Sequence, residues 1–351
     1  MEFRREKDLS IETLRGAAII LVVTGHAIGD GPGYGMGLSG DSFLRHFYFT
    51  FLYLRMPLFT VISGWVYALR PAYRSTWKVF NLRKARRLLL PMIFVGAIYY
   101  VIQYFVPGTN LKNNLQDMWR LFIFPFTIYW YLPSLFLVFL VISLLDSYGK
   151  MDSFRNWLVL LAIAVTILIV KTYVVKESDP NYLSYKGAIY LMPFFLAGIG
   201  INRFRSFFSN RYLLIILAFS LVVGLAIQQL SWYHVINYNL KKGTGIGLLI
   251  GLSGAVLLLN LKWKVRWLIW IGNFAYTIYL FHAFGTAGAR IILRAVGINS
   301  IAIIFTVSML MGIALPILLD YLFKPYNFTR LVFLGRACTA NSRKTRLNPV
   351  L

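Results

Sequence analysis

The chain has 351 residues, of which 58% are hydrophobic and 14% are charged, and its mean hydropathy is +0.66. So apolar a composition excludes an ordinary soluble domain and predicts a protein with several membrane-spanning helices. The formal net charge of +24 would suit a nucleic-acid-binding protein, but basic cytoplasmic loops beside anionic lipids explain it more simply. We therefore expect anionic lipids, and no nucleic acid, among its partners. The single cysteine, Cys338, excludes an internal disulfide.

Ten apolar segments approach the length of about 20 residues that a helix needs to cross a membrane. They predict an all-α polytopic bundle that forms one domain over residues 1–325, followed by a short basic tail over 326–351. The second segment contains Pro57, which we expect to kink or break its helix, because proline removes a backbone donor. The segments cover residues 11–29, 43–69, 88–106, 129–147, 157–175, 186–202, 211–229, 243–260, 267–284 and 300–322.

The distribution of basic residues predicts the orientation of the bundle. If the N-terminus is cytoplasmic, 24 of the 36 Lys and Arg residues fall on the cytoplasmic side and ten on the outer side. This excess follows the positive-inside rule and predicts that both termini are cytoplasmic. All four histidines then fall toward the outer half of the bundle or the outer surface: His26, His46, His234 and His282.

Three ionisable residues flank or interrupt the first apolar segment, which reads ETLRGAAIILVVTGH. Arg15 and His26 are 11 residues apart, which places them on nearly the same helix face, about 16 Å apart along the axis. Glu12 lies on the side of Arg15. Ionisable groups inside a membrane are costly and usually mark a pathway or a reaction site. The simpler alternative is an interfacial histidine at one end and an arginine that extends to the surface at the other.

A dense basic cluster ends the cytoplasmic loop over residues 70–87. Its arginines, Arg83, Arg86 and Arg87, could hold a phosphorylated donor through bidentate contacts. The alternative is a plain positive-inside anchor that binds lipid head groups.

The second segment contains Arg55, a further cation deep in the predicted membrane, which makes it a candidate site residue. Ser63 and Gly64 follow in the same segment. They permit close backbone approach by a neighbouring helix, which is the commoner use of such a pair, or by a ligand.

Aromatic residues mark two further segments. Trp130 lies where an interfacial aromatic belt is expected, although a sugar-stacking platform would use the same residue, and the sequence leaves both open. Tyr276, Tyr279 and His282 are spaced by three and therefore form a stripe along one helix face. The sequence contains no P-loop, no H-E-x-x-H and no metal-ligand spacing, so we expect no metal site.

Six motifs occur in an order that resembles the acyltransferase-3 family of bacterial multi-pass membrane acyltransferases. The resemblance extends from residue 12 to about residue 325. It implies transfer of an acyl group, commonly acetyl from acetyl-CoA, to a hydroxyl of a carbohydrate or related envelope molecule at the bacterial cytoplasmic membrane. The compact form is most similar to the sugar and exopolysaccharide O-acetylases. The motifs cover Glu12 to His26, Met56 to Gly64, Arg83 to Pro91, Trp130 to Leu132, Phe195 to Ile199, and Tyr276 to His282.

Three positions depart from the family pattern. Glu12 stands where aspartate is usual, and Arg55 stands where many relatives in the sugar branch have histidine. Ile128 and Tyr129 stand where a histidine often precedes the tryptophan motif. The last two departures concern the acceptor side.

The resemblance implies roles for the candidate residues. His26 would be the catalytic base, because the unperturbed pKa of imidazole lies near working pH. Arg15 would stabilise anionic charge on the donor or hold the helix through Glu12. Acyl-CoA, a substrate rather than a bound cofactor, would contact Arg83, Arg86, Arg87, Ser63 and Gly64, and the acceptor would contact Arg55, Trp130, Tyr279 and His282.

Two other classes would also place charges and aromatic residues inside a ten-helix bundle. A transporter or flippase of lipid-linked sugars would be expected to show internal repeats, and none is seen. A polysaccharide polymerase would usually have a large outer loop, whereas the longest outer loop here is modest. The sequence makes no prediction about the oligomeric state.

Overall fold

The chain folds into a bundle of helices in the computed structural model, which describes residues 8–31, 33–238 and 241–337. No strand occurs among these residues. Cys338 and the end of the predicted tail lie outside them. Within the described ranges, the ten helices of 17 residues or more are α1 (Leu9–Ile28), α3 (Leu52–Leu69), α4 (Trp77–Phe105), α5 (Tyr131–Ser147), α6 (Phe154–Val174), α7 (Tyr185–Arg203), α9 (Arg211–Trp232), α10 (Gly245–Leu261), α12 (Ala275–Ala295) and α13 (Ile301–Phe323).

Shorter helices connect the long ones. In the described part of the chain they are α2 (Phe43–Thr50), α8 (Arg205–Phe208), α11 (Arg266–Asn273) and α14 (Asn327–Val332), with 3₁₀ helices η1 (Arg74–Thr76), η2 (Leu115–Phe122), η3 (Thr127–Trp130) and η4 (Tyr182–Ser184).

The fold confirms the predicted all-α polytopic bundle. Eight helical spans in the described residues are long and apolar enough to cross a membrane. A ninth arises if α10 and α11, which meet at a bend of 118°, are counted as one span. The remaining long helix, α12, is more polar, because it carries His282, Arg290 and Arg294.

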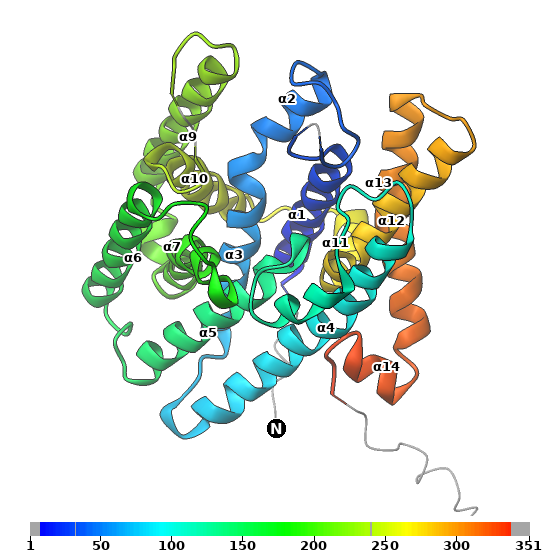
Figure 1. The fold of residues 1–351 in the computed structure, drawn as a ribbon. Helices are drawn as coiled ribbons and strands as arrows, with labels where there is room; N and C mark the ends of the chain where they lie inside the picture. The colour runs from blue at the N-terminus through cyan, green and yellow to red at the C-terminus, as the bar shows by residue number, and fades with distance from the viewer. Residues whose placement is uncertain (1–7, 32, 239–240, 338–351) are drawn as a thin grey trace, which may run out of the picture.

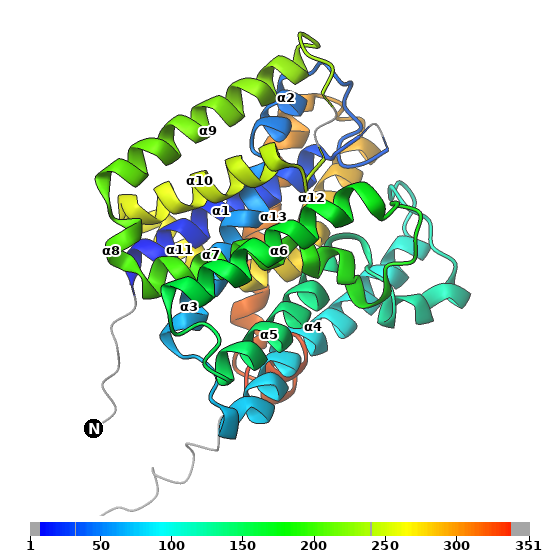
Figure 2. The same ribbon diagram turned by 90° about the vertical axis from the view of Figure 1, so that its left-hand side faces the viewer.

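Burial separates central from peripheral helices. Most of α1 and α7 is buried, whereas α6, α9 and α13 expose long apolar faces, as expected of surfaces that contact lipid. Figure 2 shows α9 at the edge of the bundle, with α10 between it and α1. The central position of α1 places its ionisable residues inside the protein.

The two ends of the bundle differ, and both ends of the described chain lie at one of them. The starts of α1 and α4, together with α14, lie at one end of the bundle, which we call the basal end (Figure 1). α1 ends at the opposite end, which we call the cavity end. The terminal residues themselves lie outside the described part of the chain, and that both termini face the cytoplasm stays a prediction.

The structure corrects the prediction for Pro57. The second segment breaks at Phe51, between α2 and α3, and Pro57 lies inside α3. The proline ring and the carbonyl of Tyr53, four residues earlier, lie against Gly251 of α10, where a Cβ would meet both. The neighbouring helix therefore packs closely where proline disturbs the backbone hydrogen bonds.

Two other segments also differ from their predicted form. Most of the basic loop over 70–87 is helical, because α4 begins at Trp77 and continues without a break through Pro91. The predicted helix over 267–284 is divided at Phe274 between α11 and α12. The predicted tyrosine and histidine stripe lies entirely on α12.

Glycines let α3 and α7 pack closely. A Cβ on Gly64 would collide with the carbonyl of Phe195, and a Cβ on Gly198 would collide with the carbonyl of Val61. Close backbone approach of this kind is the usual way in which membrane helices associate, since lipid provides no hydrophobic driving force between them. Helix packing therefore accounts for Gly64, while acyl-CoA binding at this residue stays a prediction.

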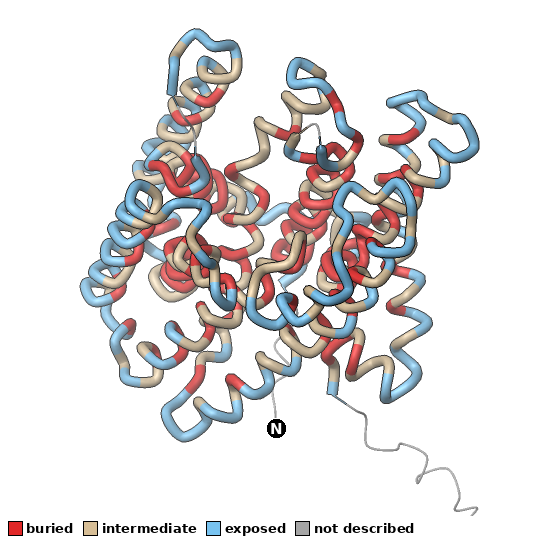
Figure 3. The backbone as a smooth tube through the Cα atoms, viewed as in Figure 1, coloured by how far each residue is buried: buried red, intermediate tan, exposed pale blue. Residues whose placement is uncertain are grey.

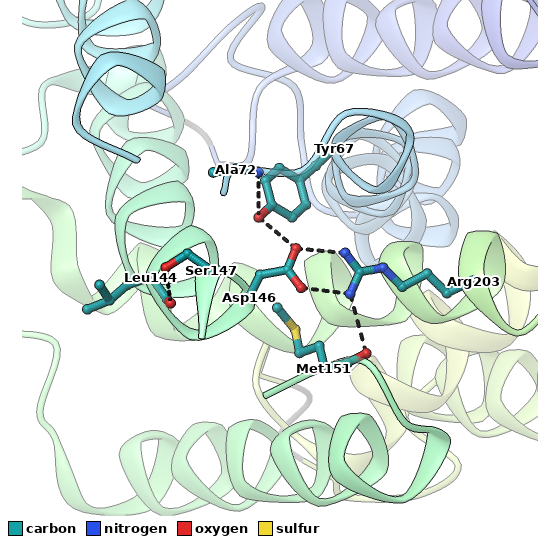
Figure 4. A network of polar contacts seen from close by, with 7 residues as sticks. All are labelled: Tyr67, Ala72, Leu144, Asp146, Ser147, Met151 and Arg203. Carbon is teal, nitrogen blue, oxygen red and sulfur yellow. Dashed lines mark hydrogen bonds and ion pairs between the residues drawn. The ribbon is translucent and has the colours of Figure 1, made fainter. Parts of the chain in front are cut away.

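A buried ion pair connects three helices at the basal end (Figure 4). Both guanidinium nitrogens of Arg203 on α7 lie 2.7 Å from the carboxylate oxygens of Asp146 on α5. The hydroxyl of Tyr67 on α3 donates to the same carboxylate at 2.9 Å, and Arg203 also donates to the carbonyl of Met151. These bonds satisfy the carboxylate and hold the ends of α3, α5 and α7 together.

We expect Asp146→Ala to lower the free energy of unfolding in detergent micelles by about 3–5 kcal/mol, because it leaves the largely buried Arg203 without a counter-charge. Denaturation followed by circular dichroism measures this change. Asp117→Ala is the control, because Asp117 and Arg120 form an exposed pair 3.9 Å apart, whose loss should cost less than about 1 kcal/mol. Equal effects of the two substitutions would show that the buried pair does not stabilise the bundle.

Candidate functional site

The first helix separates its ionisable residues between the two ends of the bundle. At the basal end, Nη1 of Arg15 lies 2.8 Å from Oε1 of Glu12, and Glu12 is buried. Glu12 lies in the first turn of α1, where a negative charge is favourable for the helix dipole. His26 lies in the last turn of α1, at the cavity end. The structure thus pairs Arg15 with Glu12, as one of the two predicted roles for Arg15 requires.

A cavity of about 750 Å³ opens at the cavity end, and His26 lines it. Arg55 of α3 and Trp130, at the end of η3, also line it, so the fold brings together three residues that are far apart in the sequence. Further polar residues in its lining include Asp30, Tyr48, Tyr99, Gln103, Asn110, Lys242 and Arg290.

Next to His26 lies the fully buried imidazole of His282, on α12. The two ring centroids are 5.0 Å apart. Nδ1 of His282 lies 3.0 Å from the carbonyl oxygen of Ile278 and 2.9 Å from that of Tyr279. A carbonyl accepts hydrogen bonds, so Nδ1 carries the proton and Nε2 is the acceptor of a neutral ring. Nε2 has no hydrogen-bond partner among the described residues.

Arg55 is the cation that packs directly beside His26. It is only 8% exposed, and its guanidinium lies over the ring of Tyr48 at 4.3 Å. A Cβ on Gly25 would collide with Nη1 of Arg55. Glycine immediately before His26 therefore makes room for the guanidinium, which gives the Gly-His sequence at the end of α1 a structural reason.

The polar stripe on α12 reaches from the basal end to His26. The hydroxyl of Tyr276 donates to the carbonyl of Arg87, and the Arg87 guanidinium lies 4.7 Å from the centre of the Tyr276 ring. Six residues farther along the helix, the ring of His282 lies beside that of His26, tilted by 40°. Tyr276 and His282 are six residues apart, which corresponds to about 9 Å along the helix axis.

Two tyrosines fill the interior between these contacts. The rings of Tyr279 and Tyr131 are 5.6 Å apart, and the hydroxyl of Tyr279 donates to the carbonyl of Ile128. The Tyr131 hydroxyl lies beside the hydroxyls of Ser63 and Thr60. Neither tyrosine belongs to the lining of the cavity, and nor do Arg15 and Arg87. The cavity and the basal end are thus separated by aromatic rings.

The basic cluster of α4 divides between two faces of the helix. Lys84 lies 4.0 Å from the centre of the Phe139 ring, and Arg87 lies over Tyr276, so both point into the bundle. Both also interact electrostatically with Arg15. Arg83 and Arg86 are exposed. Lys84 and Arg87 are three residues apart, so they would lie on the same face of a helix. The sequence alone did not indicate this face, because residues 70–87 were expected to form a loop.

Part of the predicted tail packs beneath this cluster. Arg336 binds Asp320 of α13 at 2.7 Å, and a Cβ on Gly335 would collide with the backbone of Arg87. The described residues that follow 325 therefore cover the basal end of the bundle.

The structure thus gathers the predicted residues into two groups. At the cavity end, Arg55 and Trp130 share the cavity with His26, and His282 lies next to it. Tyr279 lies one turn of α12 from His282, in the direction of the basal end. Arg15 and Arg87 lie at the basal end. Lys242 and Arg290 are cavity residues that the sequence did not indicate as candidates, because they follow no motif.

The described residues contain no group of three or more possible metal ligands.

Comparisons with known proteins agree with the motifs. No match to the chain is found among the curated proteins or among the solved structures. The sequence model of one protein family, described as an acyltransferase domain, matches residues 8–321, which is most of the chain and includes both groups of site residues. The chain belongs to the acyltransferase-3 family.

Proposed function

We propose that the protein moves an acyl group, most commonly acetyl in this family, from acyl-CoA to a hydroxyl of an envelope carbohydrate or lipid-linked sugar. The observation that carries this proposal is His26, a histidine that lines a cavity and has a guanidinium beside it, in a chain of the acyltransferase-3 family. Membership of this family favours acyl transfer over the alternatives of transport and polymerisation. We place the protein in the bacterial cytoplasmic membrane, with the cavity end outward.

In the proposed reaction, His26 removes the proton from the acceptor hydroxyl as its oxygen attacks the thioester carbonyl. The tetrahedral intermediate carries a negative charge on the former carbonyl oxygen, and Arg55 is the cation placed to stabilise it. The intermediate then collapses, the carbon–sulfur bond breaks, and the departing thiolate takes the proton from His26. The products are an ester and free coenzyme A.

His282 would orient His26 rather than react itself. Its Nδ1 proton is held by backbone carbonyls, so Nε2 is available to accept a hydrogen bond inside the protein. A buried acceptor without a partner is unfavourable. A bond from the imidazole of His26 would satisfy it and hold the base in one tautomer.

The donor would enter from the basal end. Lys84 and Arg87 face the bundle there, and such cations bind phosphates well. From Arg87 the pantetheine arm would follow the stripe on α12, which leads over about 9 Å of helix axis to His282. Tyr131 and Tyr279 occupy this route, so they would move aside when the donor binds.

Arg15 and Glu12 would support the donor rather than the base. Arg15 lies about 16 Å from His26 along α1, too far to act on the reacting carbonyl. Its interactions with Lys84 and Arg87 place its positive charge beside the proposed phosphate site. Glu12 holds the guanidinium in position through their ion pair.

We expect His26→Ala to reduce the rate of acyl transfer about 10²–10⁴-fold, because the reaction loses its general base. Mass spectrometry of envelope glycans, and release of free thiol from acyl-CoA by the purified protein, both measure this. The control is His234→Asn, because His234 is exposed and its left-handed backbone conformation suits asparagine. Normal acylation in the His26→Ala strain, with the protein inserted in the membrane, would exclude His26 as the base.

Replacement of both Lys84 and Arg87 by glutamine should raise the KM for acyl-CoA about tenfold or more, because each loses a charge-assisted contact to phosphate. We expect a smaller rise for the exposed pair, Arg83→Gln with Arg86→Gln. Arg155→Gln, an exposed change in α6, serves as the control. An unchanged KM in all variants would mean that the cluster only anchors the bundle to anionic lipid.

Gly25→Ala should lower kcat tenfold or more, because the added methyl group displaces Arg55 from its place beside His26. Alanine is the better helix former, so a loss of activity would not come from helix propensity. Gly33→Ala is the matched control, because nothing lies within 4 Å of a Cβ at that position. Equal activity of the two variants would show that the position of Arg55 does not matter for catalysis.

A further inference from the structure

The cavity beside His26 carries more positive than negative charge. Its lining residues include three that are cationic, Arg55, Lys242 and Arg290, and one that is acidic, Asp30. His26 can be neutral, so the lining has a net charge of about +2 at neutral pH. A site built for a neutral sugar needs no such excess, because hydroxyl groups are bound by neutral donors and acceptors.

None of the three cations forms an ion pair with a carboxylate among the described residues; the charges of Asp30 and Glu177 act on Lys242 only from a distance. The ion pairs of the described residues involve Arg15, Arg120, Arg203 and Arg336 instead. Arg55 lies on the ring of Tyr48, and Arg290 donates to the carbonyl of Gly35, contacts that leave the charge in place. A buried cation without a counter-charge is unfavourable, and a bound anion would remove that cost.

Lys242 is the third cation of the cavity. It lies in the connection before α10, reaches the cavity and is exposed. Burial among the surrounding protein atoms and the positive charge of Arg55 lower the pKa of Lys242, more than the carboxylates of Asp30 and Glu177 raise it. An anion between Lys242 and Arg55 would reverse the effect of that repulsion and bring the pKa back up.

We propose that the cavity binds an oxyanion carried by the acceptor, namely the carboxylate of an acidic sugar or the phosphate of a sugar phosphate. This inference rests on the proposed function, since it assumes that the acceptor occupies the cavity. One cation suffices for the transient oxyanion of acyl transfer, and Arg55 lies closest to His26 for that purpose. Lys242 and Arg290 remain to bind a permanent anion on the acceptor, while Trp130 provides an aromatic face for the ring.

Binding of three small sugars to the full-length protein in detergent micelles tests this inference. The probes are methyl β-D-glucuronide, α-D-glucose 1-phosphate and the neutral methyl β-D-glucoside, titrated by calorimetry at low ionic strength without acyl-CoA. We expect at least one charged probe to bind about tenfold more tightly than the neutral one. The glucuronide and the phosphate separate the two possible sources of the anion.

Lys242→Gln should weaken binding of the preferred charged probe about tenfold and leave binding of the neutral one unchanged. Lys241→Gln is the matched control: the neighbouring lysine is exposed and does not line the cavity. The inference is overturned if no charged probe binds more tightly than the glucoside, or if Lys242→Gln has no effect.

The inference and the proposed function fail in different ways. Acyl transfer that depends on His26, without preferential binding of a charged probe, would contradict only the anionic acceptor. Preferential binding of a charged probe by a protein that transfers no acyl group would contradict the proposed function, and the cavity would still be an oxyanion site.

Discussion

The cost of holding charge inside an apolar bundle shapes this molecule more than any other constraint. At the basal end, three largely buried carboxylates each have an arginine partner: Glu12 with Arg15, Asp146 with Arg203, and Asp320 with Arg336. Two of these pairs also bind a hydroxyl from another helix, Tyr67 or Thr277. Charge at this end is therefore used to join helices. The cations that line the cavity, Arg55, Lys242 and Arg290, form no such pair among the described residues, and we propose that the chemistry takes place beside them.

α12 connects these two regions. Its stripe contacts Arg87 through Tyr276, Tyr131 through Tyr279 and His26 through His282. Close contact with α13, where a Cβ on Gly285 would collide with the carbonyl of Met311, holds the helix in place. One continuous helix thus fixes the spacing between the proposed donor site and the proposed base, so that neither depends on a flexible loop.

The features that could be predicted from sequence are those that depend on local helix geometry. A spacing of three was enough to place Tyr276, Tyr279 and His282 on one face, and Arg15 was within reach of Glu12 for the same reason. A break at Pro57 was predicted wrongly: the helix breaks at Phe51, and Pro57 lies inside α3, packed against Gly251 of a distant helix. Lys242 and Arg290 reach the cavity only through the fold, and no local pattern marks them. The room that Gly25 makes for Arg55 is likewise visible only in three dimensions.

The loop after α1 has a consequence for the kinetics of binding. Arg45, Arg290 and Arg294 donate to the carbonyls of Gly29, Gly35 and Met36, so their hydrogen bonds are satisfied by dipoles. A dipole cancels no charge, and the field of these arginines therefore extends from the mouth of the cavity into the water over roughly a Debye length, about 8 Å at physiological ionic strength. Such a field speeds the arrival of anions and repels cations before any contact forms. Ionic strength would then control how quickly the cavity fills more than how tightly it holds what has entered.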